Sequence, residues 1–156
     1  MKPLDQATQQ FILDLIGKVS DMTLATLRPD GYPQATAVSY ANDGLTLYVG
    51  IGIDSQKAHN IRHSDKVSLA ITAPYTDWNA IQGLSMAGTA AIVAGEEETA
   101  RASACMLRRF PQLKTLTQGT SALPWEGAIF MRIVPSVISV LDYTKGFGHT
   151  ELYEVR

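Results

Sequence analysis

The sequence has little cysteine, little net charge and no long apolar run, and each shortage excludes a class of protein. Cys105 is the single cysteine among 156 residues, so no internal disulfide forms and we expect a cytoplasmic protein. A formal net charge of −2 gives no general attraction to nucleic acid or to anionic membranes. The longest uncharged apolar stretch, residues 44–53, is far shorter than the roughly 20 residues of a membrane-spanning helix. We therefore expect neither nucleic-acid binding nor a place in a membrane.

The composition is that of one globular domain covering residues 1–156. Hydrophobic residues make up 46% of the chain and charged residues 18%, a balance that buries a core at this length. An apolar residue at every third or fourth position predicts a helix over residues 4–19. Acids at Glu96–Glu98 and bases at Arg108 and Arg109 match the dipole of a helix over residues 96–110.

Runs of β-forming residues and turn signals predict six or seven strands. The runs lie at residues 22–27, 33–40, 45–51, 66–72, 84–94 and 128–141. Gly88 is expected to mark a bulge or a close backbone approach. Pro135 interrupts the last run, which predicts an edge strand or two shorter strands. Many strands with few helices favour a barrel or a sandwich.

Ser55 and Lys57 are candidate ligands of a phosphate group. Asp54 or Ser55 is suited to cap a helix of two or three turns. The free N–H groups and the dipole at a helix start attract an anion, the Ser55 hydroxyl can donate a hydrogen bond, and Lys57 adds a full positive charge. A capped surface helix with a solvated lysine is the alternative that the same residues allow.

The order of short motifs resembles that of the pyridoxamine 5'-phosphate oxidase-like family over nearly the whole chain. The motifs are Thr23–Leu27, Asp30-Gly31 with Pro33, Val38–Tyr40, Asp43-Gly44, Leu47-Tyr48, Ser55–Ile61 and Lys66–Leu69. The resemblance implies a mainly β protein with flanking α-helices, built as an antiparallel split β-barrel. It further implies a homodimer that binds two FMN molecules in clefts at the subunit interface.

The resemblance also implies which residues hold the cofactor. It places Thr36, Ala37, Val38 and Ser39 along the flavin ring, Tyr48 near the cofactor, and Ser55 and Lys57 on its phosphate. Ordinary barrel packing is the alternative for residues 36–39 and Tyr48. Leu84, Met86 and residues 90–93 are expected either to contribute to the dimer interface or to fill the core of the monomer.

Two departures from the family limit what the resemblance implies. Enzymes of the family commonly have one arginine where Gln56 stands and another on the strand near Ala35, so a phosphate has fewer cationic partners here. The oxidase itself ends in a segment of arginine and tryptophan that holds its substrate, and residues 146–156 have no such pattern. We therefore do not expect oxidation of pyridoxamine 5'-phosphate.

Several other groupings point to no second site. His59 and His63 share a helix face but offer two ligands where zinc needs three or four, so we expect no metal site. Trp78 and Trp125 lie in predicted loops, where packing at the rim or at a subunit interface is favoured over a wall of the flavin cleft. The pair Gly50 and Gly52 is expected to relieve crowding at a barrel corner.

Three functions remain open. The first is a flavin-dependent oxidoreductase of a small-molecule substrate, in which FMN supplies the redox chemistry. The second is a non-catalytic binding protein for FMN or the deazaflavin F420. The third is haem binding, because Gly146-Phe147-Gly148, which adjoins His149, resembles a segment of haem-utilisation proteins built on the same barrel.

Overall fold

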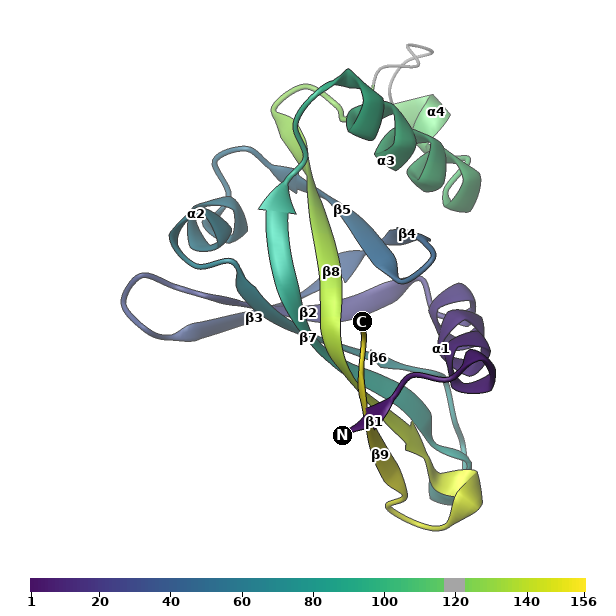
Figure 1. Ribbon diagram of the computed structural model, residues 1–156. Coiled ribbons are helices and arrows are strands. Elements are labelled where there is room, and N and C mark those ends of the chain that lie inside the picture. The colour runs from purple at the N-terminus through teal and green to yellow at the C-terminus, as the bar shows by residue number, and fades with distance from the viewer. Residues whose placement is uncertain (117–122) are drawn as a thin grey trace.

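The computed structural model describes residues 1–116 and 123–156, in which nine strands form one curved, mostly antiparallel sheet (Figure 1). The strands are β1 (Lys2–Pro3), β2 (Asp21–Leu27), β3 (Pro33–Ser39), β4 (Ala41–Asp43), β5 (Thr46–Gly52), β6 (Lys66–Thr72), β7 (Gln82–Ile92), β8 (Ala128–Asp142) and β9 (Thr150–Glu154). The helices are α1 (Gln6–Lys18), α2 (Gln56–His63), α3 (Glu96–Arg109) and α4 (Leu113–Leu116), with 3-10 turns η1 (Trp78–Ala80) and η2 (Tyr143–Lys145). The expected class, mainly β with flanking helices, is confirmed.

The sheet is organised by β8, which changes its partner along one edge. The other edge pairs with β7 from Met131 to Asp142. On the changing edge, β5 pairs as far as Ile133, and pairing with β9 begins at Val137. At the far end of the sheet, β3 pairs with β2 and with no other described strand. The sheet therefore curls into a barrel that is split along β8 and stays open between β3 and β5.

The expectation that Pro135 makes an edge strand or divides the last run was wrong. Residues 128–142 form one strand of 15 residues with a partner on each edge. Pro135 lies opposite Gly88, where the register between β7 and β8 shifts. The irregularity accommodates a residue without an N–H group, as is usual for proline within sheets. The same irregularity falls where β8 changes its partner from β5 to β9.

Three short strands were missed by the sequence analysis, so the expected count of six or seven was low. β1 and β4 have two and three residues, which is too short for any alternation to be recognised. β9 pairs antiparallel with the second half of β8 and parallel with β1. Its five residues include two glutamates, so its pattern is that of an exposed edge rather than of a buried strand.

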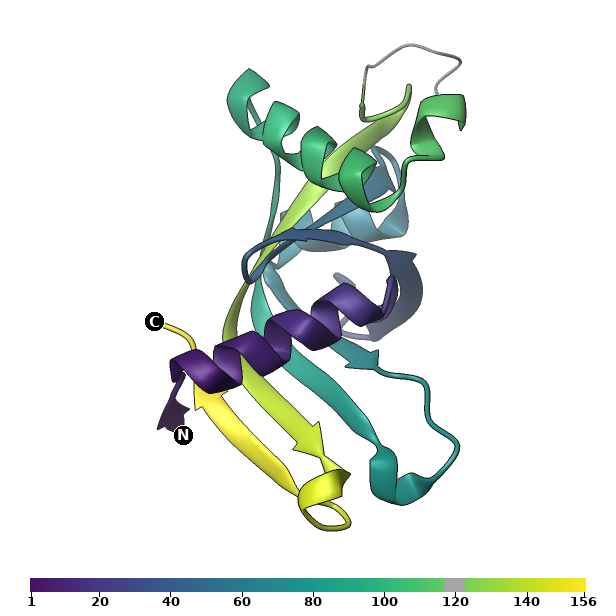
Figure 2. The ribbon, with the colours of Figure 1, turned by 90° about the vertical axis from the view of Figure 1, so that its right-hand side faces the viewer.

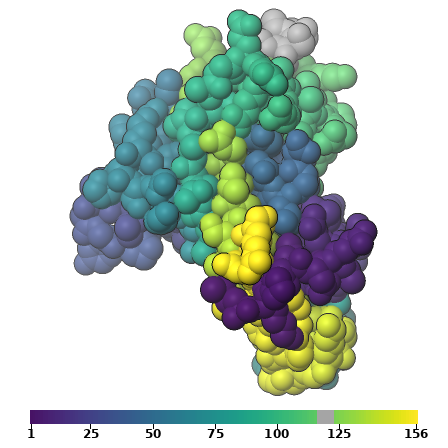
Figure 3. Space-filling view, in the orientation of Figure 1, coloured from purple at the N-terminus to yellow at the C-terminus, as the bar shows by residue number. Residues whose placement is uncertain are grey.

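The core lies between the sheet and α1, which crosses the strands in Figure 2. Asp5 caps α1 by accepting a hydrogen bond of 2.8 Å from Thr8 N, and Ile12, Leu15 and Ile16 are its buried residues. A second cluster lies beneath α3. Figure 3 shows α3 at one end of an elongated molecule and the β8–β9 hairpin at the other.

The apolar residues of β7 fill the core of the monomer, which was one of the two expectations for them. Leu84 and Met86 are each 2% exposed and Ala90 is 4% exposed. These side chains are therefore not available to a second subunit.

Candidate cofactor cleft

A cleft of about 430 Å³ lies where the barrel stays open, between β3 and β5. Its volume falls in the range of small-molecule sites. The start of α2 borders it, and α3, α4 and the segment before β8 form its remaining wall. Its lining residues are Ala37, Val38, Ser39, Gly50, Ile51, Gly52, Ser55, Lys57, Met106, Phe110, Gln112, Leu113 and Trp125.

Ser55 caps α2, as one of the two sequence alternatives proposed. Its hydroxyl donates to Gly52 O at 2.7 Å and accepts from Ala58 N at 3.2 Å. Within the described residues, no hydrogen bond joins the N–H groups of Gln56 and Lys57 to a partner. Two backbone donors at the positive end of the helix dipole are therefore left for an anion.

Lys57 links the helix to the open edge strand. Its Nζ donates to Thr36 Oγ1 on β3 at 3.2 Å. Among the lining residues that the structure describes, Lys57 carries the one ionisable side chain. The arrangement can neutralise one negatively charged group, and it offers no carboxylate or imidazole for acid–base chemistry.

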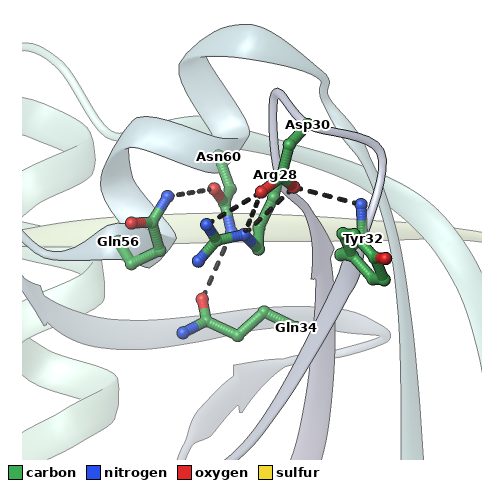
Figure 4. A network of polar contacts seen from close by, with 6 residues as sticks. All are labelled: Arg28, Asp30, Tyr32, Gln34, Gln56 and Asn60. Carbon is green, nitrogen blue, oxygen red and sulfur yellow. Dashed lines mark hydrogen bonds and ion pairs between the residues drawn. The ribbon is translucent and has the colours of Figure 1, made fainter.

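A buried polar network fixes α2 against the strands beneath it (Figure 4). Asn60, which is fully buried, donates to Thr26 Oγ1 at 2.9 Å and to Gln34 Oε1 at 3.2 Å. The side-chain oxygen Oδ1 of Asn60 accepts a hydrogen bond from Gln56 Nε2 at 2.8 Å. The side-chain amide of Gln56 is thus bonded to Asn60. Gln56 stands where related enzymes commonly have arginine, and it does not line the cleft.

Arg109 holds the helical wall of the cleft in place. From the last turn of α3, its Nη2 donates to Ile16 O at 2.7 Å and to Val19 O at 2.6 Å, at the end of α1. Its guanidinium lies 4.8 Å from the centre of the Tyr40 ring, a cation–π contact. The Tyr40 hydroxyl donates to the same two carbonyls, and burial raises the pKa of Tyr40 to about 12.

The structure brings most of the expected site residues together. Ala37, Val38, Ser39, Ser55 and Lys57 line the cleft, and Thr36 joins them through its hydrogen bond with Lys57.

Tyr48 is the expected site residue that lies elsewhere. It is 2% exposed and packs in the cluster beneath α3, where burial raises the pKa of its hydroxyl. Because side chains alternate along a strand, Tyr48 is on the same face of β5 as Gly50 and Gly52. It lies farther along the strand, where the cluster beneath α3 covers it.

Sequence reasoning missed the helical wall and the floor of the cleft. The floor is the segment Gly50–Gly52, whose glycines were the available signal. The wall includes Trp125, for which rim packing was favoured, although it lines the cleft. Met106, Phe110 and Leu113 carried no signal, because an apolar helix face does not reveal which surface it covers.

The described residues contain neither a metal site nor a membrane-spanning helix. No three His, Cys, Asp or Glu side chains gather closely enough to hold a metal ion in the part of the chain described. Within the same residues, no helix is long and apolar enough to cross a membrane.

His149 lies in a different cavity, of about 230 Å³, between α1 and the β8–β9 hairpin. Its Nε2 is buried and makes no hydrogen bond in the described structure, with Glu151 Oε1 3.9 Å away. Glu151 is already engaged: a hydrogen bond from Lys2 and another from Tyr153 lower its pKa to about 2. His149 and the cleft at Lys57 are thus separate features.

An antiparallel barrel that is left open beside a helix-capped cleft defines the split β-barrel class. Residues 8–121 match the pyridoxamine 5'-phosphate oxidase family, and the chain belongs to that family. No curated protein matches the sequence.

Solved structures share the fold over four fifths of the chain or more. A haem-binding protein from Mycobacterium smegmatis is 21% identical with a TM-score of 0.79, over 97% of this chain and 59% of that protein. A conserved hypothetical protein from Mycobacterium tuberculosis is 27% identical with a TM-score of 0.74, over 95% and 91% of the two chains. The haem storage protein HutZ from Vibrio cholerae is 20% identical with a TM-score of 0.67, over 81% and 88%. The chain therefore spans less than two thirds of the first of these proteins.

Proposed function

We propose that the cleft binds FMN and that the protein is a flavin-dependent oxidoreductase. The observation that carries the proposal is the pair of N–H groups at the start of α2, beside Ser55 and Lys57, at one end of a cleft that runs along β3. Among the described residues neither N–H group has a hydrogen-bond partner. A phosphate monoester fits this end because it gains backbone donors, a helix dipole and an ammonium group. Ala37, Val38 and Ser39 then lie along the flavin ring.

The residues of the chain would bind and orient the cofactor. Flavin, when bound, supplies the transfer of electrons or hydride. Lys57 and the N–H groups of residues 56 and 57 would hold the phosphate, and the apolar wall of Met106, Phe110 and Leu113 would keep water from the ring. Because the described lining holds no acid or base besides Lys57, protons would have to come from solvent or from the substrate.

We further propose a homodimer with two cofactor sites at its interface. One face of the sheet carries small uncharged residues in two rows across successive strands. By register, one row is Ala35, Ala25, Ser68, Ala87 and Val137 and ends at Glu154 of β9, and the other is Ala37, Thr23, Ala70, Ser85, Ser139 and Leu152. A second copy could pack closely on the middle of this face, between β3 and β8, because the charged residues Asp21, Lys66 and Glu154 lie at its margins. The second row includes Ala37, so the partner would border the cleft.

Haem is the second candidate ligand. The observation in its favour is the buried Nε2 of His149, which has no hydrogen-bond partner among the described residues. His149 follows Gly146-Phe147-Gly148, and histidine serves as an axial haem ligand. The fold likeness to haem-binding proteins supports the same reading. FMN ranks first because the phosphate donors lie in the cleft, whereas the cavity at His149 is about half as large.

Titration of the purified protein with FMN, riboflavin, F420 and haem tests the proposal. We expect micromolar FMN to bind stoichiometrically and riboflavin to bind more weakly. Failure to bind FMN, riboflavin and F420 would refute the proposed flavin binding. A Soret band that His149→Ala abolishes would establish haem as the ligand instead. Reduction of bound FMN by NADH or NADPH, followed by reoxidation with an acceptor, separates an enzyme from a storage protein for FMN or F420.

A further inference from the structure

Trp125 lies directly on the backbone of Gly50, inside the cleft. The turn that carries it is held by Ala128 N, which donates to Trp125 O at 3.0 Å, and by Ile53 N, which donates to Gly127 O at 2.9 Å. A Cβ atom at Gly50 would come within 2.7 Å of the indole Cη2 and 2.9 Å of Cζ3. The six-membered ring of the indole therefore occupies a place that only glycine leaves free.

Trp125 is held in position but is not buried. Its side chain is 42% exposed, although a large aromatic ring gains most when it is covered. Trp78, the other tryptophan, stacks on Phe147 with ring centroids 6.4 Å apart. Within the described residues, no aromatic ring stacks on Trp125. The indole thus offers the cleft an aromatic surface without a partner of its own.

The floor strand sets the spacing between this surface and the phosphate donors. Gly50 lies under Trp125, and Gly52 is in contact range of Ser55, since a Cβ at Gly52 would lie 3.6 Å from that of Ser55. Two residues of extended strand span about 7 Å. A planar ring joined by a short flexible chain to a phosphate has the shape to make both contacts at once.

We propose that Trp125 is the residue that recognises the planar ring of the ligand, while Lys57 and the N–H groups at the start of α2 recognise its phosphate. The inference rests on the proposed binding of FMN and adds a specificity-determining residue outside β3. Loss of an aromatic contact of this kind should weaken binding roughly tenfold. Riboflavin and FMN share the ring, so both should be affected equally.

Fluorescence and affinity together test the inference. In Trp78→Phe, Trp125 is the sole tryptophan, since the chain has two, and its emission should be quenched as FMN or riboflavin binds. Trp125→Ala should weaken both flavins by the same factor, whereas Trp125→Phe, which keeps a ring, should retain most of the affinity. Trp78→Phe is the matched control for affinity, because Trp78 lies outside the cleft lining.

The outcomes separate this inference from the proposed function. Failure of the unaltered protein to bind FMN would refute the proposed function itself. FMN binding that leaves the emission of Trp125 unchanged in Trp78→Phe would overturn the role of Trp125 alone. So would a folded Trp125→Ala variant with undiminished affinity for riboflavin. The fluorescence result needs no change at Trp125, so it decides the matter even if Trp125→Ala does not fold.

Discussion

The ammonium group of Lys57 on α2 donates a hydrogen bond of 3.2 Å to the hydroxyl of Thr36 on β3. The contact joins the start of a helix to an edge strand 21 residues away in sequence. Its partner is a neutral hydroxyl rather than a carboxylate, so the positive charge of Lys57 is not cancelled by this contact. The pair therefore places a usable cation at one end of the cleft.

Replacing Lys57 should weaken FMN but not riboflavin. Lys57→Met keeps an apolar stem and removes the charge, and loss of a charge-assisted hydrogen bond should lower FMN affinity by about tenfold to a hundredfold. Lys18→Met, at the exposed end of α1, is the control for loss of one positive charge. Isothermal titration measures both ligands. Equal losses for FMN and riboflavin would show that Lys57 is structural.

A large charged side chain on the small-residue face should separate the dimer. Ser68 is exposed on β6 and lies in the middle of one row, opposite Ala25 and Ala87. Ser68→Arg should therefore convert a dimer to a monomer in sedimentation equilibrium, while Gln9→Arg on the exposed side of α1 should not. If binding and assembly are linked, FMN should tighten the dimer and dilution should release flavin. A monomer that binds FMN stoichiometrically before any substitution would refute the shared site.

Removal of Asn60 should destabilise the fold. Asn60→Ala leaves Thr26 and Gln34 without their donor and Gln56 without its acceptor, and unsatisfied buried groups cost about 1–3 kcal/mol each. We expect the free energy of unfolding in urea to fall by roughly that amount. His59→Ala, one residue earlier on the exposed face of the same helix, should change it little. An unchanged urea midpoint for Asn60→Ala would mean that the network adds nothing.

Gly88→Ala should be among the more damaging substitutions outside the cleft. A Cβ at Gly88 would lie 2.4 Å from Val134 O and 3.0 Å from the Cα of Pro135, so two paired strands would have to move apart. Overpacking of this kind costs about 1–3 kcal/mol or more. Gly17→Ala in α1, where nothing lies within 4 Å, should instead gain roughly 0.5–1 kcal/mol. A lower thermal unfolding midpoint for Gly17→Ala than for Gly88→Ala would contradict the close approach of Gly88 to Val134 and Pro135.

Alkaline pH should weaken the fold through Tyr40. Burial raises its pKa from 10.0 to about 12, so the unfolded chain loses this proton before the folded one does. The contribution of Tyr40 is therefore complete below pH 10 and is lost as the pH rises toward 12, by on the order of 2 kcal/mol. Tyr40→Phe should flatten this part of the profile of unfolding free energy against pH. A profile of the same slope in both proteins would assign the loss to other groups.

Local signals in the sequence determined most of the elements and one half of the site. Hairpin residues, apolar spacing and the Ser55 cap depend on neighbours a few residues away, so they can be read without the fold. They gave α1, α2, α3 and the strands from β2 to β8 except the short β4. Ser55 and Lys57 were identified for the same reason, because a helix start carries its own anion chemistry.

Only the tertiary structure decided how these pieces combine. In the sequence, Pro135 predicts an interruption of the last strand. In the structure it lies opposite Gly88, where the pairing of β7 and β8 is irregular and tolerates a proline. Tyr48 falls in the expected strand and on the same face as Gly50 and Gly52, but the cluster beneath α3 covers that part of the strand. Trp125 joins the cleft because its turn bonds to the end of β5, more than 70 residues earlier in the chain. Contacts over such separations depend on sheet register and on helix docking, and no local pattern of residues encodes either.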